Sequence, residues 1–198
     1  MSENPPTPAG ERPLDRRARR TRDALGDALI ALVHEKPFDE IRVQDVLERA
    51  GVSRSTFYAH FRDKDDLFAR DVGEFYERVA MGLSERREPS QRVAPVREFF
   101  AHVAEAGPFR AALSASGRLR ETLELGRAPF ARGIERRLTE LTRSAALTAD
   151  ERALFAQACA ATLIAWLEAW LERGMPETPE RMDELFHRFV WSGVGAGR

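Results

Sequence analysis

Apolar residues recur every three to four positions along most of the chain, which is the spacing of one face of an α-helix. Three helices are predicted before residue 62, and later ones span about 64–83, 91–106, 108–114, 118–146, 149–173 and 178–192. Neither an alternating strand pattern of useful length nor an internal repeat occurs. The sequence therefore predicts an all-α fold of about nine helices.

The second and third predicted helices are joined by a tight turn. Pro37 closes the first helix, and the second covers about 43–50. Gly51 is suited to the left-handed conformation that follows a helix, and Ser53 can cap the third helix, from 54 to 61. The result is helix, tight turn, helix.

The third helix has a small, polar outer face. Phe57 and Phe61 lie one turn apart and mark its buried side. The outward and flanking residues are Ser55, Thr56, Tyr58 and Ala59. A surface helix that needs only solubility would carry Glu and Lys, whereas small residues let a helix approach the floor of the DNA major groove. Arg54, at the N-terminal end, suits the O6 and N7 acceptors of guanine.

Three further side chains near this helix can donate to phosphate oxygens. Tyr58 and His60 can do so from the helix itself. Lys64 lies near the start of the next helix, where free backbone N–H groups and the helix dipole add to its attraction for phosphate.

The segment FDEIRVQDVLERAGVSRSTFYAHFRDKDDLF, Phe38 to Phe68, resembles the DNA-binding segment of the TetR family of transcriptional repressors. Ala-Gly-Val-Ser, the Phe-Tyr pair, His60 with Phe61, and Lys64 with Leu67 stand at the family's spacings. This match over about thirty residues is more specific than a generic helix-turn-helix.

The resemblance implies a homodimer. Each subunit would carry a three-helix DNA-binding domain over 14–62 and a helical domain over 63–198 that binds a small effector and dimerises. The family's DNA-contacting positions fall here on Gln44, Arg54, Ser55, Thr56, Tyr58, His60 and Lys64. At the start of the second helix the family usually has Thr or Ser, and this chain has Arg42, which can reach a phosphate but cannot cap.

The segment Arg12 to Arg22 holds six arginines against one acid, a local charge of +5, although the net charge of the chain is only -1. Such a run is often just a solvated helix start. In the fold implied by the resemblance it lies beside the DNA backbone, so we expect Arg19 and Arg20 to contact phosphates without reading sequence.

The region from about 91 to 142 is rich in phenylalanine and poor in polar groups. In the family it surrounds the effector cavity, and an apolar lining favours a hydrophobic or aromatic effector. The predicted ligand-binding residues are Phe99, Phe100, His102, Val103, Phe130, Thr162 and Trp166. The alternative for each is an ordinary core position.

The last two helices carry heavy apolar faces with interspersed alanines. In the family these helices build a four-helix dimer interface. The residues predicted there are Ala161, Ala165, Trp170, Phe186, Phe189 and Val190.

Composition fits a soluble protein with a real core, since 43% of residues are apolar. Residues 1–13, with four prolines, are predicted to be a disordered leader without the apolar region of a signal peptide. No apolar run suggests a membrane span, so we expect the cytoplasm. The single cysteine, Cys159, cannot form an internal disulfide and is predicted to lie in the core.

An enzyme is the alternative of a different class. The four histidines are scattered without metal-ligand spacing, and there is no glycine-rich phosphate loop. No cofactor, metal or membrane partner is therefore predicted. A helical dimeric protein without DNA binding is the other alternative, but its third helix should then present acids or bulky apolar groups. We predict a ligand-responsive transcriptional regulator, a repressor that a small hydrophobic effector releases from a palindromic operator.

Overall fold

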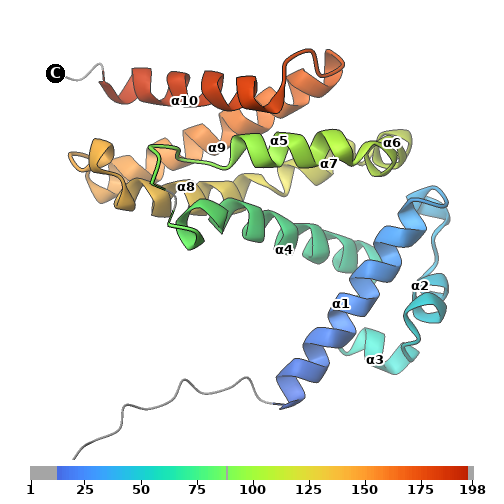
Figure 1. Ribbon diagram of the computed structural model, residues 1–198. Helices are drawn as coiled ribbons and strands as arrows, with labels where there is room; N and C mark the ends of the chain where they lie inside the picture. The colour runs from blue at the N-terminus through green and yellow to red at the C-terminus, as the bar shows by residue number, and fades with distance from the viewer. Residues whose placement is uncertain (1–12, 88, 196–198) are drawn as a thin grey trace, which may run out of the picture.

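The structure is a computed structural model that describes residues 13–87 and 89–195, and this part of the chain is helical without a strand (Figure 1). The N-terminal lobe consists of α1 (Pro13–Val33), the 3-10 helix η1 (Phe38–Glu40), α2 (Val43–Ala50) and α3 (Arg54–Tyr58). The second lobe consists of α4 (Lys64–Glu85), α5 (Val96–Glu105), α6 (Gly107–Ala115), α7 (Leu119–Glu124), α8 (Arg127–Glu140), η2 (Thr142–Ser144), α9 (Ala149–Glu172) and α10 (Pro179–Gly195). The all-α prediction is confirmed.

Two of the helices predicted for the second lobe differ from the prediction. The predicted helix 118–146 is divided into α7, α8 and η2. Helix α7 ends at Glu124, Gly126 packs on Tyr76 just before α8, and the extended Leu141 separates α8 from η2. A Cβ at Gly126 would lie 2.9 Å from the Tyr76 ring. The predicted helix 91–106 begins only at Val96, after the non-helical residues that end in Pro95. Of the predicted leader 1–13, only Pro13 lies within the described residues, and it starts α1, where the missing N–H is tolerated.

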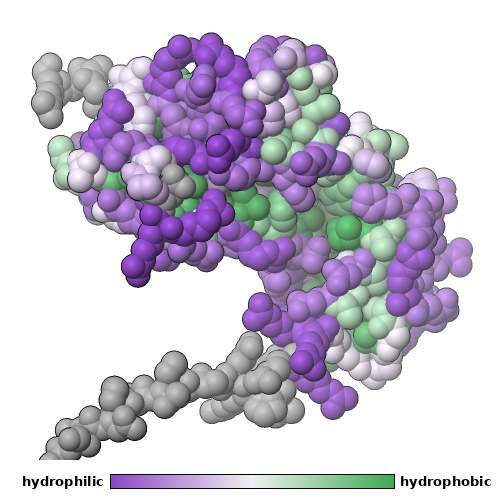
Figure 2. Space-filling view, in the orientation of Figure 1, coloured by the Kyte–Doolittle hydropathy of each residue, from purple (hydrophilic) through white to green (hydrophobic). Residues whose placement is uncertain are grey.

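The long helix α4 joins the two lobes (Figure 1). Its first half packs on α1, and the helix also packs on α8, which in turn packs on α9. Helix α10 packs on α5 at the far side of the second lobe. Apolar side chains gather in the hollow where the lobes meet, on the face shown in Figure 2. A movement of α4 is therefore communicated to both lobes.

Helix α9 is long and apolar enough to cross a membrane by length and composition alone, which the sequence prediction did not anticipate. Its side chains Leu163, Ile164 and Leu167 are fully buried in the core of the second lobe. Cys159 is also buried there, and burial raises the pKa of its thiol to about 11. Packing in the core thus explains why these positions of α9 are apolar.

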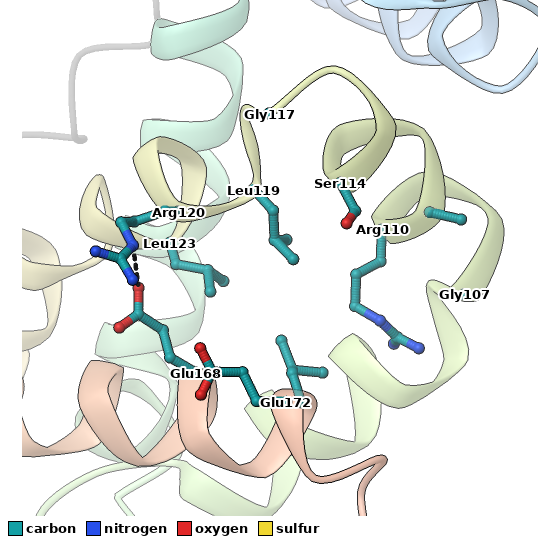
Figure 3. A pocket seen from close by; sticks show the side chains of 11 residues that line it. Gly107, Arg110, Ser114, Gly117, Leu119, Arg120, Leu123, Glu168 and Glu172 are labelled. Carbon is teal, nitrogen blue, oxygen red and sulfur yellow. Dashed lines mark ion pairs between the residues drawn. The ribbon is translucent and has the colours of Figure 1, made fainter.

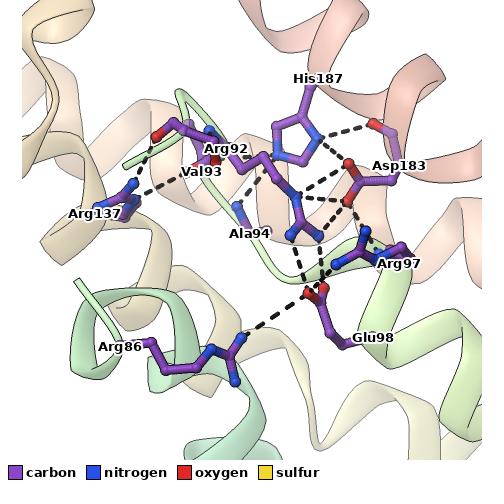
Figure 4. A network of polar contacts seen from close by, with 10 residues as sticks. Arg86, Arg92, Val93, Ala94, Arg97, Glu98, Arg137, Asp183 and His187 are labelled. Carbon is purple, nitrogen blue, oxygen red and sulfur yellow. Dashed lines mark hydrogen bonds and ion pairs between the residues drawn. The ribbon is translucent and has the colours of Figure 1, made fainter. Parts of the chain in front are cut away.

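A polar network ties the segment before α5 to α10 (Figure 4). The Arg92 guanidinium donates to Glu98 at 2.6 Å and to Asp183 at 2.6 Å. His187 Nε2 accepts a hydrogen bond from the Val93 N–H at 3.0 Å. Burial alone would raise the pKa of Glu98 and of Asp183, but hydrogen bonds from Arg92, and for Asp183 also from His187, lower both to about 2. The network holds α10 against α5.

Candidate nucleic-acid interface and ligand pocket

The predicted turn between α2 and α3 is confirmed in its details. Gly51 has a φ of 64°, and its N–H donates to the Leu47 carbonyl at the end of α2. A glycine adopts this left-handed conformation without the steric penalty of a Cβ. The Ser53 Oγ accepts from the Thr56 N–H at 3.3 Å and so caps α3.

Helix α3 is shorter than predicted, because it ends at Tyr58 rather than Phe61. The His60 N–H donates to the Phe57 carbonyl at 2.9 Å, a spacing of three residues that tightens the last turn. Phe57 and Phe61 are both buried, as their spacing predicted, and are 0% and 3% exposed. The buried side of the helix is therefore the predicted one.

The opposite side of α3 faces solvent. Arg54 and Ser55 are exposed, Thr56 is half-buried, and the Tyr58 ring is 51% exposed. The Arg54 guanidinium has no ion-pair or hydrogen-bond partner in the described part of the chain, whereas Arg49 pairs with Glu35 at 2.6 Å. Arg54 thus presents its full set of donors to an incoming ligand.

Helix α2 begins without a side-chain cap from Arg42, as expected for an arginine at that position. The Asp45 Oδ2 instead accepts from the Arg42 N–H at 2.8 Å and from Lys36 Nζ at 2.6 Å. The hydrogen bond from Lys36, and then that from Arg42, lowers the pKa of Asp45. The exposed side chain of Gln44 donates to Glu48 at 2.9 Å.

Lys64 requires a correction. Its ammonium donates to the carbonyl oxygens of Phe38 at 2.6 Å, Ile41 at 2.8 Å and Asp39 at 3.4 Å. An ammonium has three N–H donors, so these carbonyls use all of them, and burial lowers its pKa. The side chain therefore fixes η1 against α4, and this arrangement leaves no donor for the phosphate contact predicted from sequence.

The remaining predicted DNA contacts are His60 and the arginines of α1. His60 is half-buried beside the Phe61 ring. Arg19 and Arg20 are exposed on α1, so most of the basic run is helical. Arg12 lies outside the described residues, and so does the side chain of Arg16.

A cavity of about 320 Å³, here called the inner pocket, lies between the lobes. Its walls come from α1, α4, α5, α6 and α7, and of the predicted residues it contains Phe99, His102 and Val103. Other lining residues are Ile30, His34, Asp71, Val72, Phe75, Tyr76, Phe109, Arg110, Leu113, Leu119, Thr122 and Leu123. The cavity is mostly apolar and aromatic.

Four of the predicted ligand-binding residues lie elsewhere. Phe100 packs on Trp170 with ring centroids 4.9 Å apart, and Phe130 packs on Phe99 at 4.8 Å. Both are fully buried core residues, since the helices around them leave no space. Thr162 and Trp166 lie on α9, outside the lining of the inner pocket. The spacing of apolar residues did not distinguish core from cavity.

A second cavity of about 550 Å³, the outer pocket, opens between α6, α7 and α9 (Figure 3). An ion pair at 3.8 Å joins Arg120 to Glu168 across it. Arg110, Leu119 and Leu123 line both cavities and form the wall between them. The Arg110 guanidinium donates to the Val103 carbonyl, which fixes it in that wall.

Sequence reasoning missed Asp71, Phe75 and Phe109 in the inner pocket. The burial of Asp71 could have been predicted from the sequence, because it lies one turn from both Leu67 and Phe75 on the apolar stripe of α4. An acid within such a stripe is buried beside the core or faces a cavity.

The predicted dimer face is smaller than expected. Three of these residues are buried within the subunit. Trp170 packs on Phe100 of α5, and Phe186 and Val190 lie on α10, which packs on α5. Ala165 and Phe189 are exposed, the latter at 53%, and Ala161 is half-buried. The Trp166 ring lies 5.7 Å from the ring of Phe189. Leu154 on α9, 71% exposed, is an apolar residue that the sequence did not single out.

Comparison with known proteins agrees with this geometry. The family model described as "Bacterial regulatory proteins, tetR family" matches residues 25–70. The fatty acid metabolism regulator protein of Bacillus subtilis (strain 168) is 28% identical over 74 residues, which cover 35% of this chain and 38% of that protein. The chain thus covers well under two thirds of the curated relatives that it matches.

Solved structures match nearly the whole chain. A TetR transcriptional regulator from Streptococcus agalactiae 2603V aligns with a TM-score of 0.56 and 23% identity, over 91% of this chain and 97% of that one. The fatty acid degradation regulator FadR from Bacillus halodurans aligns with a TM-score of 0.58 and 16% identity, over 96% and 99%. The segment from α1 into α4 thus matches the model of the tetR family of bacterial regulatory proteins, and the chain shares its fold with solved TetR regulators.

Proposed function

We propose that the protein is a transcriptional regulator that binds an inverted-repeat operator as a homodimer and acts as a repressor. The observation that carries this proposal is the outer face of α3, which is small and polar and has the unpaired Arg54 at its N-terminal end. Each subunit has one such helix, so two-fold protein symmetry requires two-fold DNA symmetry. The exposed apolar residues Leu154 and Phe189 support a dimer face on α9 and α10.

In this proposal the domain boundary lies between 62 and 63, and the inner pocket takes a small apolar effector that releases the DNA. Arg118, between α6 and α7, supports such coupling. Its guanidinium lies 4.1 Å from the Phe38 ring and donates to Asp65 at 2.6 Å. Arg118, which directly precedes Leu119 of the pocket wall, thus contacts Phe38 of the N-terminal lobe, and a ligand that moves this wall would change the spacing of the two α3 helices.

The DNA-binding proposal is tested by selecting binding sites from random DNA with the wild-type protein and two variants. Arg54→Ala should relax base preference at one position of each half-site, at a cost of about 1–3 kcal/mol. Arg132→Ala, which removes an exposed arginine of α8 that pairs with Glu77, is the control and should leave the profile unchanged. Selected sites without dyad symmetry, or identical profiles for all three proteins, would contradict the proposal.

The effector site is tested separately with Val103→Trp. Val103 is half-buried and lines the inner pocket, so the larger ring should fill part of the cavity. The variant should lose its response to ligand and keep operator affinity near that of wild type. A full ligand response in a folded variant would place the effector site elsewhere.

A further inference from the structure

The charges around the inner pocket are unevenly placed. Its lining holds one acid, Asp71, and one arginine, Arg110, besides two histidines. Arg110 is held in the wall toward the outer pocket by the Val103 carbonyl. Asp71 lies on α4 against α1, where a Cβ on Gly26 would be 2.4 Å from its Oδ1. Its carboxylate has no hydrogen-bond or ion-pair partner in the described part of the chain.

The surroundings of Asp71 favour a positive charge. Burial raises the pKa of Asp71, and nearby Glu74, Asp27 and Asp23 act in the same direction, while Arg78 opposes them. A carboxylate that is partly removed from water and unpaired is costly, and a cation beside it would offset that cost. The acids nearby add negative potential at the same place.

Aromatic rings cover the space next to this carboxylate. The rings of Phe75 and His102 lie 4.6 Å apart, and those of His34 and Phe109 lie 5.7 Å apart. Ring faces attract organic cations as well as apolar groups. A molecule with an apolar body and a cationic group would find aromatic rings and a carboxylate in the same cavity.

We propose that the inner pocket binds an amphipathic organic cation, with its ammonium group paired to Asp71 and its apolar body among Phe75, Phe99 and Phe109. The inference rests on the proposed function, because it names the chemical class of the effector. A carboxylate such as that of a fatty acid would be repelled by Asp71 but could pair with Arg110, so tighter binding of an anionic probe than of a cationic one would assign the site to Arg110 instead. The likeness to fatty acid regulators does not bear on this choice, since it shows the fold and the N-terminal segment only.

The test uses three probes of similar size, naphthylethylamine, naphthylethanol and naphthylacetate, which are cationic, neutral and anionic at neutral pH. Binding to the full chain without DNA is measured by isothermal titration calorimetry. The amine should bind at least about tenfold more tightly than the alcohol, and the acetate should bind most weakly. Tighter binding of the alcohol or the acetate, or no binding of the amine at millimolar concentration, would overturn the proposal.

Three variants assign the preference to one carboxylate. Asp71→Asn should bind amine and alcohol within about twofold of each other, whereas Asp71→Glu, which keeps the charge, should retain the preference for the amine. Glu85→Gln, which removes an exposed carboxylate at the end of α4, outside the pocket lining and away from Asp71, is the control and should behave as wild type. Circular dichroism melting verifies that each variant is folded. A preference that survives in Asp71→Asn would overturn the proposal.

Operator release is measured in a separate experiment by fluorescence anisotropy of labelled DNA. If the amine binds through Asp71 without weakening DNA binding, the ligand class stands and the effector part of the proposed function fails. If the acetate or the alcohol releases DNA and the amine does not, the effector function stands and the ligand class fails. The two proposals can therefore fail independently.

Discussion

Helices α4 and α8 cross so closely that Gly133→Ala should destabilise the protein, although replacing glycine by alanine within a helix usually stabilises it. At Gly133 in α8, an added Cβ would lie 2.5 Å from the Ala80 carbonyl oxygen and 3.0 Å from the Ala80 Cβ. Ordinary contact begins at 3.4 Å, so Gly133→Ala must separate the helix backbones locally by about 0.9 Å. Because the obstacle is mainly backbone, no side-chain rotation can relieve it.

The expected magnitude comes from two opposing effects. Overpacking in a core costs about 1–3 kcal/mol. Replacing glycine by alanine inside a helix otherwise stabilises by about 0.5–1 kcal/mol. The difference spans about 0–2.5 kcal/mol, and from the midpoints we expect Gly133→Ala to lower the free energy of unfolding by about 1 kcal/mol. Gly73→Ala in α4, where an added Cβ meets nothing within 4 Å, should raise it by about 0.5–1 kcal/mol and is the matched control.

Urea unfolding followed by circular dichroism measures both variants at one protein concentration, because the stability of the proposed homodimer would depend on concentration. The two midpoints should move in opposite directions, with unchanged slopes. Equal or greater stability of Gly133→Ala relative to wild type would show that α4 and α8 do not approach as closely as described.

Three further outcomes are expected. Lys64→Ala should lower the stability of the N-terminal lobe by about 1–2 kcal/mol while leaving the salt dependence of DNA binding unchanged; a slope smaller by about one unit would restore the phosphate contact. The folded pKa values of Glu98 and Asp183, about 2, lie below their unfolded values. The stability that these two groups contribute is therefore present above about pH 4.5 and is lost as the pH falls toward 2. In urea titrations, Arg92→Met should lose less stability than wild type over this pH range. Phe189→Asp should convert a dimer to a folded monomer in sedimentation, because the side chain is 53% exposed, and should remove the concentration dependence of the melting temperature; a dimer that persists would exclude this face.

Features set by neighbours in sequence could be predicted. The left-handed Gly51 and the Ser53 cap follow from backbone sterics and from hydrogen bonds within a few residues, so the turn appears as expected. The buried side of α3 follows from the spacing of Phe57 and Phe61. These effects need no knowledge of the rest of the chain.

Features set by contacts between residues far apart in the sequence could not be predicted. Helical spacing shows that Phe100 and Trp170 face away from water, but not whether they meet their own core, a cavity or a second subunit. The Lys64 ammonium donates to carbonyls more than twenty residues away in the sequence, at Phe38 and Ile41, and these hydrogen bonds determine its role. Both cases were decided by how the helices assemble.

The shortness of α3 has a consequence for how such a protein changes over evolutionary time. A helix of five residues cannot persist alone, and here the Ser53 cap and the buried Phe57 hold it in place. Arg54 and Ser55 on its outer side add no buried surface, and substitutions at exposed positions of this kind change stability little. After gene duplication, mutations at these two positions could accumulate without unfolding the domain, and the daughter proteins could then acquire separate DNA targets on an unchanged scaffold.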